Sequence, residues 1–265
     1  MPKPAALHVA TFNIHKGFSQ FNRRMMVHEL RERLRHLNPD IVFLQEVQGL
    51  HLGHAENHDD WPSEPQHEFL AEEVWHDSAY GSNMIYDHGH HGNAILSRFP
   101  ILHTHNQDVT HLQFEKRGLL HCRIQLPGGP AAHCVCVHLS LFGYSRRRQV
   151  SALADYLDAV SSPNVPLIIA GDFNDWSNRA GHQLVTRLGL TEVFSNGTGA
   201  PVRSYPAALP MFRLDRIYVR GFQVLDMYVP QGLAWARCSD HAPLIAELEL
   251  EPSRLRPQVA TRLAE

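Results

Sequence analysis

The sequence lacks the features that identify several large classes of protein. No apolar run approaches the length of a membrane-spanning helix, and residues 1–12 contain no apolar stretch preceded by positive charge, which a secretory signal would require. The formal net charge is −3, so the strongly basic surface of a dedicated nucleic-acid-binding protein is missing as well. We therefore expect a cytoplasmic protein, and the charge weakens a nuclease function without excluding it.

Cysteine and lysine are scarce. The four cysteines, Cys122, Cys134, Cys136 and Cys238, contain no C-x-x-C pair, so we expect buried free thiols in a reducing compartment. Of the 24 basic residues, only Lys3, Lys16 and Lys116 are lysine. Arginine is the better bidentate partner for phosphate, although most surface arginines are simply solvated charges.

Linkers and internal repeats are also absent. The interior has no Gly/Ser-rich or Pro-rich segment that would separate domains, and 43% of the 265 residues are hydrophobic, which is ample for one core. We predict a single domain over residues 1–250 and a monomer. Residues 251–265 contain scattered charge, two prolines and little apolar content, which is typical of a C-terminal tail.

The apolar residues alternate between strand-like and helix-like patterns. Apolar spacings of three and four predict helices near residues 27–37, 68–74, 145–160 and 179–188, and Ser145 is the expected N-cap of the third. Strands are expected near residues 7–12, 41–46, 83–86, 93–97, 104–110, 119–126, 132–137, 165–170, 214–219, 222–229 and 244–250. This mixture indicates the α/β class.

Residues 48–91 form a histidine-rich segment of irregular composition. Its eight histidines are His51, His54, His58, His67, His76, His88, His90 and His91. Such a cluster could bind a transition metal, but no H-E-x-x-H motif or fixed Cys/His spacing occurs. We therefore interpret the segment as a polar surface insertion, with zinc binding as the alternative.

Polar residues recur where strands begin or end. The apolar run 165–170 leads into Gly171-Asp172-Phe173-Asn174, Asn13 follows the run 7–12, and Glu46 follows the run 41–45. An isolated Asp-x-Asn is more commonly a turn, but its recurrence with strand-end acids and amides points to one cluster. Carboxylate and amide oxygens are the ligands that Mg²⁺ prefers, so the pattern predicts a hard-metal site.

These motifs, in order, resemble those of the endonuclease/exonuclease/phosphatase superfamily, which includes DNase I. Further matching blocks are Gly92–Ser97, Val137–Leu139, Leu214–Ile217 and Ser239-Asp240-His241, so the likeness covers residues 7–249 apart from the histidine-rich segment. The resemblance implies a DNase I-like four-layer α/β sandwich, in which two packed mixed β-sheets are flanked by helices. It also implies metal-dependent hydrolysis of a phosphate ester by an activated water.

The resemblance also implies roles for single residues. Glu46 would be the main ligand of Mg²⁺, or of Mn²⁺, assisted by Asn13 and Asp240. Asp172 would orient or deprotonate the attacking water, and Asn174 would hold that water or a phosphate oxygen.

His241 would contact the scissile phosphate while Asp215 accepts a hydrogen bond from its other ring nitrogen. A salt bridge of Asp215 to Arg213 or Arg216 is the alternative. His138 would bind phosphate or protonate the leaving group, but the glutamate that orients this histidine in DNase I-like members has no counterpart after Ser97-Arg98. Arg117 would contact phosphate, and Asn93 would support the site.

Three functions are considered, of which we place a phosphodiesterase acting as an endonuclease first and an enzyme for a lipid headgroup or small phosphoester second. A nuclease could use Arg117 with Arg146, Arg147 and Arg148 to line a groove for a nucleic-acid backbone. An enzyme acting on a membrane lipid headgroup or a small phosphoester suits the near-neutral charge, with Trp61 and Trp75 as available membrane contacts. A non-enzymatic phosphate binder is the third, and the complete set of catalytic residue types argues against it.

Overall fold

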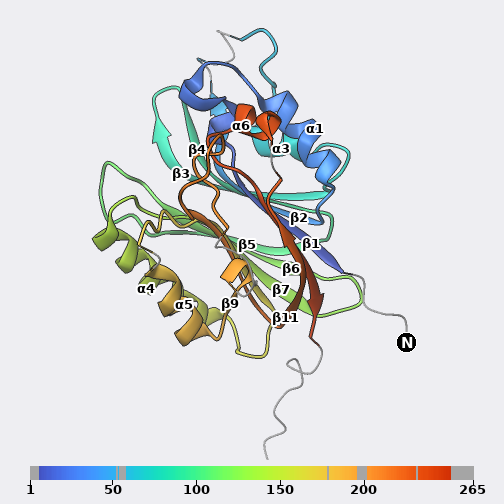
Figure 1. The fold of residues 1–265 in the computed structure, drawn as a ribbon, viewed down its shortest axis with the longest axis vertical. Coiled ribbons are helices and arrows are strands. Elements are labelled where there is room, and N and C mark those ends of the chain that lie inside the picture. Colours follow the sequence, from blue (N-terminus) through green and yellow to red (C-terminus); the bar gives the residue numbers. More distant parts are fainter. Residues whose placement is uncertain are drawn as a thin grey trace, which may run out of the picture.

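Two six-stranded β-sheets pack face to face in the computed structural model, which describes residues 6–51, 53, 58–177, 179–195, 202–230 and 232–251. Helices cover the outer face of each sheet, so the described chain has four layers (Figure 1). The α/β sandwich expected from the sequence is confirmed. The tail 252–265 and His54 lie outside the described residues.

The first sheet has the strand order β11-β12-β1-β2-β4-β3. Its strands are β1 (Leu7–Asn13), β2 (Ile41–His51), β3 (Asp77–Tyr86), β4 (Gly89–Ser97), β11 (Phe222–Tyr228) and β12 (Leu244–Leu250). Strands β1 and β2 are parallel, and the other neighbours are antiparallel. Parallel strands end at the same edge, so Asn13 and the second half of β2 lie close together.

The second sheet has the order β5-β6-β7-β8-β10-β9. Its strands are β5 (Ile101–Asp108), β6 (Gly118–Gln125), β7 (Ala131–His138), β8 (Leu167–Asp172), β9 (Thr191–Glu192) and β10 (Asp215–Arg220). Strands β7 and β8 are parallel, which places His138 opposite Asp172.

Helices α1 (Val27–Leu37), α3 (Gln66–Ala71) and α6 (Leu233–Cys238) lie over the first sheet, and α4 (Gly143–Val160) and α5 (Ala180–Leu188) lie over the second (Figure 1). Short 3₁₀ turns η1 (His15–Gly17), η2 (Gln20–Asn22) and η3 (Val193–Ser195) complete the elements. Each layer boundary is apolar, because both helices and strands bury one face.

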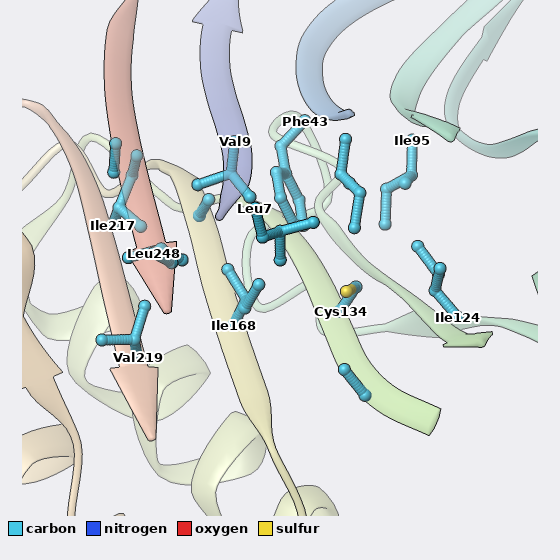
Figure 2. Close-up of a cluster of buried hydrophobic side chains, with 14 of the residues drawn as sticks. Leu7, Val9, Phe43, Ile95, Ile124, Cys134, Ile168, Ile217, Val219 and Leu248 are labelled. Atoms are coloured by element: carbon cyan, nitrogen blue, oxygen red, sulfur yellow. The ribbon is translucent and has the colours of Figure 1, made fainter. Parts of the chain in front are cut away.

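The central boundary is the one between the two sheets. Val9 and Phe43 of the first sheet pack there against Ile168 and Cys134 of the second (Figure 2). The side chains that alternate with these face the helices instead, as Ala10 and Val42 do. All four cysteines are buried and free, as expected.

The histidine-rich segment is not an irregular insertion. It contains the end of β2, helix α3, the whole of β3 and the start of β4. Strand β3 lies at the edge of its sheet, where both faces tolerate polar residues, so the alternation that reveals a strand is weak there. The predicted helix 68–74 is shifted to 66–71, and the six-residue helix α6 was not anticipated.

The predicted N-cap Ser145 is wrong. Helix α4 begins at Gly143, its N-cap is Phe142, and Ser145 is a buried residue inside the first turn. The backbone N–H of Arg146 donates to the carbonyl of Phe142.

Within the described residues, no helix has both the length and the hydropathy of a membrane span.

Candidate active site

Polar residues from strand ends meet at one edge of the sandwich. Asp172 ends β8, and Asp215 begins the antiparallel neighbour β10 directly opposite it. His138 ends β7 and is opposite Asp172 on the other side. Asn13 ends β1 of the first sheet, and His241 lies between α6 and β12. The topology therefore brings together groups that are up to 228 positions apart, from 13 to 241.

Glu46 reaches this edge because β2 bulges there. The pairing of β2 with β4 shifts register between Leu44 and Val47, and Glu46 has a φ of 56°. A bulge with positive φ turns one side chain out of the regular alternation. The Glu46 carboxylate consequently lies 3.3 Å from Asn13 Nδ2 rather than in either core.

Two backbone features shape the turn after β8. Gly171 has a φ of 148°, and a Cβ atom there would lie 2.0 Å from the carbonyl oxygen of Val137, so this close approach of β8 to β7 requires glycine. Asn174 has a φ of 47°, and its side-chain amide donates to the carbonyl of Leu139 at 3.0 Å. The turn holds Asp172 and Asn174 in fixed positions beside His138.

Asp172 is buried at the centre of the group. Its Oδ1 accepts the backbone N–H of Asn174 at 2.9 Å, and its Oδ2 lies 3.5 Å from His138 Nε2 and 3.8 Å from His241 Nε2. Burial raises the pKa of Asp172 to about 6, with Asp215 adding to the rise and His241 opposing it. Asp172 is thus a carboxylate whose basicity is increased by its surroundings.

His241 and Asp215 form a buried ion pair. Nδ1 of His241 donates to Oδ2 of Asp215 at 2.7 Å, which is the pairing expected from the sequence. Arg216, one alternative partner of Asp215, binds Glu192 instead. Burial opposes protonation of His241, but Asp215 and Asp172 outweigh it and raise its pKa to about 10. His241 is therefore an imidazolium at neutral pH.

His138 has the opposite protonation state. Burial, together with the positive charges of Arg117 and His241, holds the pKa of His138 well below its usual value. Its ring is therefore neutral at pH 7. The carboxylate beside this ring belongs to Asp172 and not to a residue after Ser97-Arg98, where the family resemblance would place it.

Carboxylates beside Asp172 form a candidate metal site. Asn13 Nδ2 lies 3.3 Å from Glu46 Oε1 and 3.2 Å from Asp172 Oδ2, while Asn13 Oδ1 accepts the backbone N–H of His15. In this arrangement Asn13 holds two carboxylates through its nitrogen, so Glu46 and Asp240 offer the freer oxygen donors. Hard cations such as Mg²⁺ and Mn²⁺ prefer such oxygens, and the donor set fits them.

Two basic side chains that the sequence did not single out face these acids. Lys16 Nζ lies 3.9 Å from Glu46 Oε2, and His15 Nδ1 lies 3.5 Å from Asp240 Oδ1. Burial opposes ionisation of Glu46, but Lys16 and His15 outweigh it and hold its pKa below the usual value. Glu46 is therefore ionised at neutral pH.

A second group of possible ligands consists of Asp172, Asp215 and His241, with one ligand atom of each within 4.8 Å of the others. In this group Nδ1 of His241 donates to Asp215 and Nε2 lies 3.8 Å from Asp172 Oδ2, which is the arrangement of an acid–base pair. The oxygen donors around Glu46 suit a hard cation.

Arg117 and Asn93 lie beside His138. The Arg117 guanidinium donates to the Glu115 carboxylate and to two backbone carbonyls, which fixes its position. Asn93 Nδ2 donates to the backbone, and its buried Oδ1 has no hydrogen-bond partner among the described residues. A small pocket is lined by Asn83, His91, Gly92, Asn93, Lys116, Arg117 and His138. The sequence placed His91 only within the histidine-rich segment, because it carries no strand-end signal that would connect it with His138.

The arginine groove expected for nucleic acid is wrong for Arg146. This residue is buried, donates to backbone carbonyls at 140 and 141, and lies 3.8 Å from Asp175 Oδ1. Asp175 also lies 3.7 Å from Arg216, which is held in turn by Glu192. These residues form a buried ionic support under the turn 172–175, whereas Arg147 and Arg148 are exposed.

Aromatic rings flank the His241 side of the site. The ring of Tyr205 lies 4.9 Å from that of His241, and Trp176 contacts both Tyr205 and Phe212. The suggested membrane contact Trp75 is buried, and its Nε1 donates to the carbonyl of Pro39, so that expectation is wrong. Trp61 stacks on Phe18 at 5.7 Å.

Comparison with known proteins identifies relatives of this chain. The chain is 46% identical over 243 residues to the uncharacterized protein YbhP of Escherichia coli (strain K12), covering 91% of this chain and 96% of that one. The structure of an endonuclease/exonuclease/phosphatase from Beutenbergia cavernae superposes with a TM-score of 0.73 at 20% identity, covering 92% of this chain and 72% of that one.

The mannosyl-6-phosphatase Bt3783 of Bacteroides thetaiotaomicron superposes with a TM-score of 0.68 at 17% identity, covering 91% of this chain and 99% of that one. At such identities these structures establish the shared fold. The model of the Endonuclease/Exonuclease/phosphatase family, whose members hydrolyse phosphate esters, matches residues 10–241. The chain therefore belongs to the endonuclease/exonuclease/phosphatase family.

Proposed function

We propose that the protein is a divalent-metal-dependent phosphodiesterase that uses an activated water. The observation that carries the proposal is the contact between a basic buried carboxylate and a protonated imidazole, with Asp172 Oδ2 3.8 Å from His241 Nε2. Both pKa values are raised, that of Asp172 by burial and that of His241 by the two neighbouring carboxylates, and such shifts at adjacent titratable groups are characteristic of catalytic sites.

The residues divide the work of one displacement at phosphorus. Asp172 takes the proton of the attacking water, whose oxygen bonds to phosphorus while the ester bond breaks, and the leaving oxygen departs as an alkoxide that takes a proton from solvent. His241 donates a charged hydrogen bond to the phosphate oxygens, and Asp215 keeps that ring protonated and oriented. Asn174, fixed by its bond to the backbone at Leu139, lies where it can hold the water.

His138 is assigned a hydrogen-bonding role toward the phosphate rather than that of a general acid. The pKa of His138 lies well below its usual value, so too small a fraction of the rings is protonated at pH 7 to deliver a proton to a leaving group. Arg117 and Lys116, on the same side, supply positive charge next to it.

A divalent cation would be held by Glu46 and Asp240, with the Asn13 amide fixing Glu46 beside Asp172, and would neutralise charge on the phosphate. We expect EDTA to abolish hydrolysis of bis-p-nitrophenyl phosphate, and Mg²⁺ or Mn²⁺ to restore it. Glu46→Gln should raise the Mg²⁺ concentration needed for half-maximal rate by about tenfold to a hundredfold, because a charged ligand becomes neutral.

Isothermal titration of Mg²⁺ into both proteins measures the same effect without turnover. Glu249→Gln is the matched control, because Glu249 lies near the end of β12 that is away from His241. Full turnover in EDTA would overturn the metal assignment.

The pH dependence of kcat/KM should be a broad bell. Asp172 works as a carboxylate, and burial sets its pKa at about 6, so the rate should fall as the pH drops through that value. His241 works as an imidazolium with a pKa of about 10, so the rate should fall again as the pH rises through it. Rates between about pH 5 and pH 11 check both limbs.

Asp215→Asn should move the alkaline limb to lower pH, because it removes the charge that raises the pKa of His241. A limb that stays in place in this variant would contradict the assignment of the imidazolium to His241.

A further inference from the structure

Exposed apolar side chains gather at the catalytic edge. Phe114 is 70% exposed, Leu141 is 52% exposed and Phe142 is 51% exposed. We name these three residues the apolar rim. Phe114 belongs to the loop between β5 and β6, and the other two belong to the loop between β7 and α4, so both loops start or end beside His138 or Arg117. Exposing three large apolar side chains together is unfavourable unless a partner covers them.

The rim is rigid. The rings of Phe114 and Phe142 lie edge to face with their centroids 5.9 Å apart. Beneath them the Glu115 carboxylate accepts hydrogen bonds from the backbone N–H of Leu141 at 3.0 Å, from Arg117 and from Ser140. Glu115 thus ties the two loops together and has its own charge compensated. The apolar side chains are held outward by a buried polar brace.

The rim borders a groove that runs toward the catalytic residues. The groove has a volume of about 410 Å³ and is lined by Met84, His91, Phe114, Glu115, Lys116, Arg117, Leu141 and Phe142. His91, Lys116 and Arg117 also line the small pocket that contains His138. One end of the groove is therefore basic and next to the phosphate-binding residues, and the other end is apolar.

Positive charge surrounds the rim. Arg147 and Arg148 are exposed on the first turns of α4, where Arg147 lies over the ring of Tyr144 at 5.9 Å and Arg148 donates to its hydroxyl. Tyr144 is itself 59% exposed. Aromatic rings interleaved with arginine and lysine suit the interface of a bilayer that carries anionic lipids.

Other loops at this edge have the same character. Phe21, Trp176, Leu209 and Phe212 are exposed, and they come from the loops that follow β1 and β8 and precede β10. Leu102, in contrast, is an exposed apolar residue near the start of β5, at the opposite end of that strand from the Phe114 loop. Leu102, Val160, Val185 and Leu225 are exposed elsewhere on the described surface, so the feature of this edge is that several of its loops contribute such residues together.

We propose that the apolar rim docks the catalytic edge on an anionic phospholipid bilayer, and that the substrate is a phosphodiester of a membrane lipid. The phosphate would lie at His138 and His241, and the apolar part of the lipid would follow the groove past Met84. This inference rests on the proposed phosphodiesterase function and names its substrate class. A nucleic acid is less suited, because Arg146 is buried and the end of the groove away from Lys116 and Arg117 is lined by apolar side chains.

The test measures binding of the full chain to phosphatidylglycerol vesicles by sedimentation, without metal so that no turnover occurs. The wild-type protein should bind, and the Phe114→Ser/Phe142→Ser variant should bind at least about tenfold more weakly, because two exposed rings no longer enter the bilayer. Leu102→Ser is the matched control and should bind as the wild type does. Phosphatidylcholine vesicles should bind more weakly than phosphatidylglycerol vesicles.

Turnover gives a second readout with Mg²⁺ present. The double variant should lose at least about tenfold more of its rate on phosphatidylglycerol vesicles than on soluble bis-p-nitrophenyl phosphate. Absence of wild-type vesicle binding, equal binding of the double variant, or rim-dependent binding of single-stranded DNA in its place would each overturn the inference. If the wild-type protein does not hydrolyse bis-p-nitrophenyl phosphate, the phosphodiesterase proposal is overturned instead.

Discussion

Replacing His241 by glutamine is expected to lower kcat for bis-p-nitrophenyl phosphate by about a thousandfold, because the imidazolium is the charged donor nearest the reacting carboxylate. Glutamine retains a hydrogen-bond donor and similar length but carries no charge. The Asp215 carboxylate then stays buried without its cationic partner, so we also expect the melting temperature to fall.

A control variant separates an effect on catalysis from an effect on folding. His105→Gln makes the same change at an exposed position on β5 and should leave both kcat and the melting temperature as they are. Far-ultraviolet circular dichroism should show the wild-type spectrum for His241→Gln at the assay temperature. A folded His241→Gln protein with more than a tenth of the wild-type kcat would refute the proposed role.

Asp172→Asn is the second change with a large expected effect. The amide cannot accept the proton of the attacking water, and general-base catalysis contributes about a hundredfold to ten-thousandfold in rate, so we expect kcat to fall by about a thousandfold. The melting temperature should rise or stay constant, because burial makes the charge of Asp172 unfavourable, as its raised pKa reflects. Thermal unfolding at pH 7 measures this.

Asp226→Asn is the control for Asp172→Asn, since Asp226 is exposed on β11 and its carboxylate bonds only to its own neighbour's backbone in the described contacts. The expected combination is a large loss of rate without a loss of stability. An Asp172→Asn protein that unfolds more easily than the wild type would show that the carboxylate mainly holds the site together. Wild-type kcat in the variant would remove Asp172 from the mechanism.

Several of the residues that sequence reasoning found share one property: they stand where an apolar strand begins or ends. Asn13, Asp172 and His138 have this position, and strand ends at one edge of a sheet must lie near one another. The strand-end pattern could therefore predict that these residues cluster at one edge, whereas the four-layer sandwich followed from the family resemblance. Glu46 was found by the same reasoning, although a bulge within β2, rather than the end of the strand, brings it there.

The residues that sequence reasoning missed or misplaced owe their positions to contacts with residues far away in the sequence. Lys16 lies in a 3₁₀ turn, and its proximity to Glu46 depends on a left-handed backbone that no periodic pattern announces. Arg146 stands between residues of similar polarity, and only its pairing with Asp175 shows that it is internal. The apolar rim escaped notice because an exposed phenylalanine and a core phenylalanine look alike in sequence.

The pairs at the centre of the site cross from one sheet to the other. Asn13 of the first sheet binds Asp172 of the second, and His241, which precedes β12 of the first, binds Asp215 of the second. The reacting groups are thus assembled only while two separately hydrogen-bonded halves keep their alignment to within about an ångström. Sliding one half over the other would dismantle the centre without breaking a single strand pairing, so activity reports on that alignment more sensitively than any measure of secondary structure.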